Sequence, residues 1–109
     1  MKCTFDPKQY LKQQEVLTGE MIAGIADILE DAGIEGDQLK ELAGKIAFDV
    51  ACKIDDVSGL EFEGDEAHPF LMFVSEQNEE ELIHFGGNSA THEMVFGILN
   101  AMFSETHNK

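Results

Sequence analysis

The feature that most constrains the fold is one long apolar stripe near the start of the chain. On a wheel of 100° per residue, the apolar side chains between residues 7 and 32 gather on one side. Asp6 followed by Pro7 is a helix-start signal, and Gly33 supplies a stop. The pattern predicts a helix over 7–32, about 39 Å long. In a chain of 109 residues, such a helix leaves room for a single domain, 1–109.

A second helical segment follows after a short linker at 34–36. Asp37 is a suitable N-cap, and apolar residues recur at helical spacing over 38–54. Phe48 and Cys52 lie opposite the main stripe, and a helix that is apolar on two sides usually contacts two neighbours. Because the linker is short, the two helices are expected to pack antiparallel as a hairpin.

Three short segments in the second half have the character of strands. Residues 60–63 alternate apolar and acidic, 70–74 are apolar on both faces, and 82–85 form a third strand. Between the first two, 64–69 are expected to form a loop. Short connections favour neighbouring strands, so the segments predict an antiparallel meander.

The last helix is expected over 89–105, with Asn88 or Ser89 as its cap. The resulting order is ααβββα, a single acidic α+β domain. It contains a two-helix hairpin, a three-stranded antiparallel meander and a C-terminal helix packed on the small sheet.

Signals for export and membrane insertion are absent from the sequence. No apolar run approaches the roughly 18 residues of a transmembrane helix. Polar residues from Asp6 onward interrupt any secretory signal. Two cysteines, Cys3 and Cys52, do not indicate a disulfide scaffold, and we expect free thiols in the reducing cytoplasm.

Acidic residues are concentrated in one part of the chain. The 22 acids and 7 basic residues give a net charge of −15, which disfavours direct binding to nucleic acid. Ten of the acids fall within 55–81, where no Lys or Arg occurs. This segment is a solvated surface that discourages aggregation, a docking surface for a basic protein, or a mimic of nucleic-acid phosphates. The acids predicted to bind a partner are Asp55, Asp56, Glu61, Glu63, Asp65 and Glu66.

The final helix carries more apolar surface than one neighbour can cover. A second apolar row, spaced i, i+4, i+7, i+11, runs beside its main stripe. Either the helix is central in the fold, or the row is covered by a second copy in a two-fold dimer. The residues of this row, also predicted to bind a partner, are His92, Phe96, Leu99 and Phe103.

The sequence contains no nucleophile elbow, phosphate loop, dinucleotide fingerprint or CxxC pair, so no catalytic residue and no cofactor is predicted. The candidates for a metal are His84, His92 and Glu93, although their spacing matches no established zinc pattern. Gln14 and Thr18 interrupt the first helix's stripe. They either bond to the backbone or face a polar ligand.

These observations favour a non-catalytic protein-binding or regulatory module that acts as a homodimer and has a basic protein partner. One alternative is a small-molecule or metal-binding protein with a site near His84, Asn88 and His92. The other is an acidic mimic of nucleic acid that inhibits a nucleic-acid-binding protein.

Overall fold

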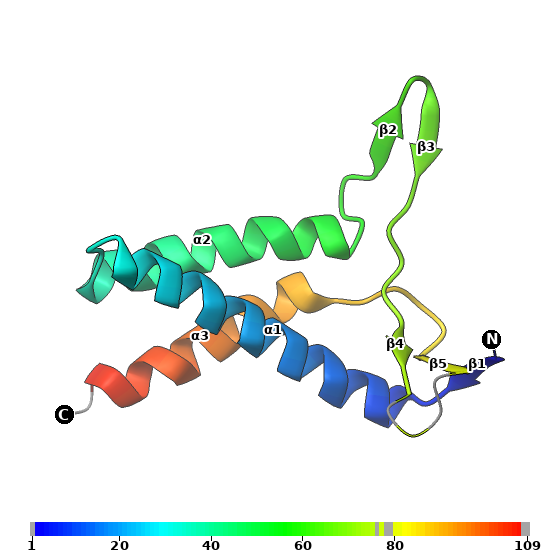
Figure 1. The fold of residues 1–109 in the computed structure, drawn as a ribbon, viewed down its shortest axis with the longest axis horizontal. Helices are drawn as coiled ribbons and strands as arrows, with labels where there is room; N and C mark the ends of the chain where they lie inside the picture. Colours follow the sequence, from blue (N-terminus) through cyan, green and yellow to red (C-terminus); the bar gives the residue numbers. More distant parts are fainter. Residues whose placement is uncertain (1, 76, 78–79, 108–109) are drawn as a thin grey trace.

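The chain folds into an α+β structure, as its sequence pattern predicts. The computed structural model describes residues 2–75, 77 and 80–107, among which three helices and five strands are seen. In Figure 1 the helices lie together, one sheet lies at the end where α1 begins, and a hairpin stands apart. The elements are β1 (Lys2–Phe5), α1 (Pro7–Asp31), α2 (Gly36–Ile54), β2 (Leu60–Phe62), β3 (Asp65–Ala67), β4 (Phe73–Val74), β5 (Glu81–His84) and α3 (Thr91–His107).

Helix α1 confirms the predicted long helix to within one residue. The Asp6 side chain caps it by accepting a hydrogen bond from the backbone N–H of Gln9 at 3.1 Å. The helix ends before Gly33, whose φ of +90° is easily adopted by glycine. The buried stripe of this helix consists of Tyr10, Gln14, Thr18, Ile22 and Ala26.

Helix α2 begins earlier than predicted, and Asp37 is not its cap. The N-cap is Glu35, whose side chain makes no capping hydrogen bond. Asp37 lies in the first turn instead, where a carboxylate favours the helix by interacting with its dipole. The helix then packs back along α1 as the predicted hairpin (Figure 1).

The main core lies between the three helices. Ala43, Ala47 and Ala51 of α2 are completely buried there, and their small side chains allow both neighbouring helices to approach. Gly44 has the same effect, because a Cβ at this position would lie 2.7 Å from Cδ2 of Leu99 on α3. Helix α3 is therefore held closely against α2.

The predicted meander is not confirmed. The three-stranded sheet has the order β1-β5-β4, with β5 parallel to β1 and antiparallel to β4. Its central residue is Ile83, which is 2% exposed and opposes Thr4 on one side and Phe73 on the other. Of the segment 70–74, only the last two residues pair, and they do so at the sheet's edge. The chain's first residues supply the unpredicted strand.

The segment 60–63 also pairs differently from the prediction. Its strand, β2, forms a separate antiparallel hairpin with β3, which occupies the centre of the predicted loop at 64–69. Local pairing through a tight turn is easier to form than a pairing across a longer connection.

The molecule is extended rather than round. Its principal extents are 47 × 38 × 21 Å. Its radius of gyration is 16.0 Å, whereas a compact chain of this length is expected to have about 13 Å. Within the described ranges, none of the helices combines the length and apolarity needed to cross a membrane.

Candidate functional site

The β2–β3 hairpin, hereafter the arm (residues 60–67), projects from the helices (Figure 1). Every one of its residues is exposed. Phe62 is 75% exposed and Leu60 is 52% exposed. Isolated two-stranded hairpins are marginally stable in water. Phe62 and Leu60 are neighbours in the arm, and adjacent exposed apolar side chains are more informative than single ones.

The turn of the arm uses two residues with positive φ, Glu63 at 51° and Gly64 at 86°. These values suit the tight two-residue turn that joins right-handed twisted strands. Glycine takes such a conformation freely, but glutamate does so at a cost. The arm thus has a defined shape but little stability of its own.

The two faces of the arm differ chemically. Leu60 opposes Ala67, and Phe62 opposes Asp65, so these four side chains share one face. Glu61 opposes Glu66 on the other face, where two like charges repel each other. One face is therefore mainly apolar with one carboxylate at its tip, and the other is acidic.

The segments just before and just after the arm contact each other through Asp56 and His68. His68 Nδ1 lies 2.8 Å from the Oδ2 atom of Asp56, and its Nε2 lies 3.9 Å from Glu66. Asp56 has a positive φ of 60°, which turns the chain out of α2 toward the arm. Asp56 thus acts as a local support rather than as part of an open acidic surface.

Asp55 lies at the start of this segment, and its carboxylate is buried with 1% of the side chain exposed. It accepts hydrogen bonds from the hydroxyls of Ser89 (2.5 Å) and Thr91 (2.8 Å). It also accepts one from the backbone N–H of His92 (2.7 Å), and it contacts the Nδ1 atom of that ring. The carboxylate therefore caps α3 from outside the helix, where Asn88 or Ser89 was predicted to cap it.

Burial alone would raise the pKa of Asp55, because it disfavours the charged form. The hydrogen bonds from the His92 amide, the Ser89 hydroxyl, the His92 ring and the Thr91 hydroxyl act in the opposite direction and prevail. The pKa of Asp55 is consequently below its ordinary value, and the carboxylate remains charged at neutral pH.

Asn88 completes this polar junction. Its amide nitrogen donates to the backbone oxygens of Asp55 (3.1 Å) and Pro69 (2.8 Å). Its oxygen accepts from the amides of Leu71 (3.1 Å) and Ser89 (2.8 Å). All four hydrogen-bonding positions of the side chain are used, so Asn88 has a structural role here.

Gln14 and Thr18 likewise bond to the backbone, which is one of the two roles predicted for them. The Gln14 Oε1 atom accepts a hydrogen bond from the N–H of Ala90, and Thr18 donates to the oxygen of Gln14 at 2.8 Å. Gln14 thereby fixes the start of α3 against α1.

The candidate metal ligands do not form a cluster. His84 Nδ1 accepts from the N–H of Gly86 at 3.1 Å, and its ring packs against Phe5. His92 is engaged with Asp55, and Glu93 is exposed. Within residues 2–75, 77 and 80–107, no three His, Cys, Asp or Glu side chains converge as a metal site would require. The two cysteines are free.

The apolar row of α3 is divided between core and surface. Leu99 is 3% exposed, whereas Phe96 is 48% exposed. The Phe96 ring packs against Phe48 of α2 at 5.5 Å, and the Phe48 ring contacts His92 at 6.0 Å. Phe103 is half-buried against the helical core. Much of the row thus contacts α2 within the same chain.

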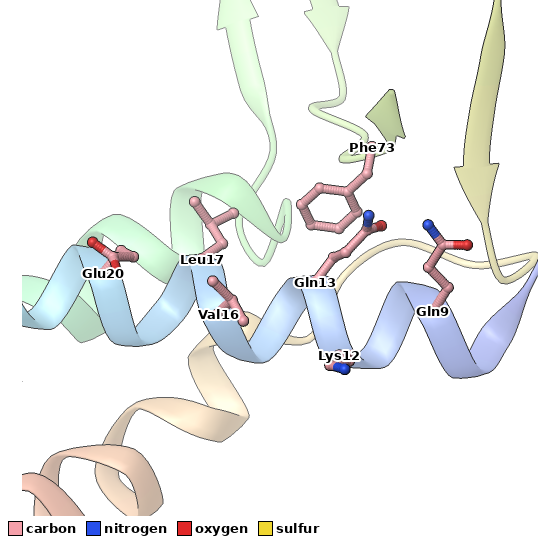
Figure 2. Close-up of a pocket in the computed structure, with 7 residues that line it drawn as sticks. All are labelled: Gln9, Lys12, Gln13, Val16, Leu17, Glu20 and Phe73. Atoms are coloured by element: carbon pink, nitrogen blue, oxygen red, sulfur yellow. The ribbon is translucent and has the colours of Figure 1, made fainter. Parts of the chain in front are cut away.

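An apolar groove of about 600 Å³ runs along α1 beside β4 (Figure 2). The sequence analysis did not predict this groove. Val16, Leu17 and Phe73 supply its apolar wall, Lys12 supplies a positive charge and Glu20 a negative one. The Oε1 atom of Gln13, also in the wall, is buried without a hydrogen-bond partner in the described part of the chain.

Sequence reasoning named the acids of the arm but not its exposed aromatic residue or the groove. The available signal for the arm was Gly64 directly after the alternating segment 60–63, since glycine readily supplies the positive φ that a two-residue hairpin turn requires. Comparison with known proteins gives no match to a family model, to a curated protein or to a solved structure.

Proposed function

We propose that this protein is a non-catalytic protein-binding module that acts as a homodimer. The observation that carries the proposal is the large solvent-accessible surface of the chain. The chain exposes 7398 Å², whereas a compact monomer of 12.1 kDa is expected to expose about 6,000 Å². The excess is comparable to what one protein contributes to a stable interface, about 800 Å² or more.

The apolar side chains of the arm are part of this excess. Burying Phe62 and Leu60 in an interface would remove apolar area from water and stabilise the arm, which gains little from its own chain. The two free cysteines are compatible with a reducing, cytoplasmic location.

The test is sedimentation equilibrium of the wild-type protein and of the double variant Leu60→Ser, Phe62→Ser. We expect the wild type to have twice the mass of 12.1 kDa and the variant to dissociate at least tenfold more readily. A matched control is Ile28→Ser, which removes an exposed apolar side chain from α1. A wild-type protein that stays monomeric at every concentration would contradict the proposal.

The acidic face of the arm supports a second part of the proposal, a basic protein partner for the dimer. Glu61 and Glu66 face the same way, and the arm contains no Lys or Arg; the His68 ring, just after the arm, lies 3.9 Å from Glu66 and leaves Glu61 to the partner. A positively charged group of a partner would reduce the repulsion between these two carboxylates. Attraction between opposite charges also speeds association at low salt.

A fluorescent lysine-rich peptide is a suitable probe for this face. We expect binding that falls steeply with salt and is lost when Glu61→Gln and Glu66→Gln are combined. The control, Glu15→Gln with Glu30→Gln, changes the net charge equally on exposed positions of α1. Equal loss in both variants would mean attraction by net charge alone and would remove the acidic face from the proposal.

A further inference from the structure

We infer that the arm of one copy lies in the α1–β4 groove of a second copy, and that the second copy's arm lies in the groove of the first. This inference rests on the proposed homodimer and specifies which surfaces form it. Phe62 would pack against Val16, Leu17 and Phe73, and Asp65 would approach Lys12.

The apolar face of the arm matches the groove in composition. The arm offers two large apolar side chains and one carboxylate at the tip, all on one face. The groove offers an apolar wall around Val16, which is 58% exposed, and two charged residues, Lys12 and Glu20, two helical turns apart. Only one direction of the arm brings Asp65 to Lys12 and keeps it away from Glu20. Complementary charges of this kind fix the orientation of two surfaces more than they add affinity.

The groove also has an unsatisfied acceptor. Oε1 of Gln13 is buried and has no partner in the described residues, and Figure 2 shows this side chain directly beside Phe73. An orphaned acceptor of this kind is costly to leave unpaired. A backbone N–H of an inserted strand would provide the missing donor after a rotation of the amide.

The occupant cannot be the same molecule's arm. The arm points away from α1 and β4 (Figure 1), and all of its residues are exposed. Its two ends are held together, because Asn88 bonds to both Asp55 and Pro69 and because Asp56 contacts His68. The arm is therefore available only to another molecule.

A second copy is the occupant that the geometry favours. Each copy carries both an arm and a groove, so a two-fold axis would bury two arms at once and close the assembly. The surface in excess of a compact monomer, roughly 1,400 Å² per chain, is ample for such an exchange.

The test is cross-linking between two different chains that lack both native cysteines through Cys3→Ser and Cys52→Ala. One chain carries Asp65→Cys, which leaves Phe62 in place on the same face of the arm, and the other carries Val16→Cys. The two chains are mixed before mild oxidation. A disulfide forms readily only where Cα atoms come within about 7 Å. The control replaces Val16→Cys with Ile28→Cys, on the same helix and also exposed.

We expect a covalent dimer from the mixture with Val16→Cys and at least tenfold less from the mixture with Ile28→Cys. Sedimentation of the same mixtures before oxidation separates the two ways of failing. Dimeric chains that do not cross-link preferentially at Val16 would overturn this inference and leave the homodimer intact. Monomeric chains that do not cross-link would overturn both.

Discussion

The polar junction around Asp55 and the arm that follows it in the chain use the same residue types in opposite ways. At the junction, the carboxylate, two hydroxyls and an asparagine amide are buried and bonded to one another. On the arm, the carboxylates and aromatic residue are exposed to solvent. Polar groups that form hydrogen bonds within the chain stabilise the fold. Exposed groups that lack such contacts are available to bind a partner.

The largest expected effect comes from replacing one aspartate with alanine in each region, Asp55 at the junction and Asp65 on the arm. Asp55→Ala should lower the free energy of unfolding by about 3–5 kcal/mol, because it leaves buried donors from Ser89, Thr91 and His92 unpaired. Asp65→Ala should lower it by less than about 0.5 kcal/mol, because that side chain is exposed. Urea denaturation at one fixed protein concentration measures both. Similar losses in the two variants would erase the distinction between the regions.

A smaller effect is expected from acid. The pKa of Asp55 is lower in the folded chain than in the unfolded one, where it is about 3.9. Its contribution is therefore fully present above that value and is lost as the pH falls through the folded pKa. Urea midpoints from neutral pH down to about pH 3 should fall less steeply for Asp55→Asn than for the wild type. Asp65→Asn is the control and should keep the wild-type slope; an unchanged slope for Asp55→Asn would count against this role.

The smallest effect is expected at the rim of the groove. Lys12→Glu and Asp65→Lys should each weaken the dimer by about two- to fivefold, as exposed ion pairs contribute little. Combining the two should recover most of the loss, because the charges are only exchanged. Dimer dissociation constants from sedimentation at low salt measure this. A combined variant weaker than either single variant would argue against contact between these positions.

The helices could be predicted from sequence because their signals are local. Asp6, Pro7 and Gly33 mark the ends of α1, and the 3.6-residue period between them fixes the buried face. The starts of the other two helices are exceptions: α2 begins after Glu35 and not after Asp37, and the cap of α3 is Asp55, 36 residues before Thr91 in the chain. A cap that comes from another element leaves no local pattern.

The strands were less predictable because short apolar segments do not specify their partners. The sequence over 2–5 lacks an obvious strand pattern but pairs with β5, while most of 70–74 stays unpaired. For the candidate site, the acidic residues were evident from composition. The groove was not, because it is formed by one side of α1 together with Phe73, which is distant in sequence.

The single amide of Asn88 bonds to the chain just before the arm and just after it, at Asp55 and Pro69. It therefore closes residues 55–69 into a loop whose ends are fixed regardless of what lies between them. For a loop closed in this way, doubling the length costs only about 0.6 kcal/mol. Residues 57–67 can thus be shortened, lengthened or exchanged for another sequence while Asp55 still caps α3 and the three helices keep their packing. Changes to the arm therefore alter the surface that it offers to a partner without disturbing the packing of the helices.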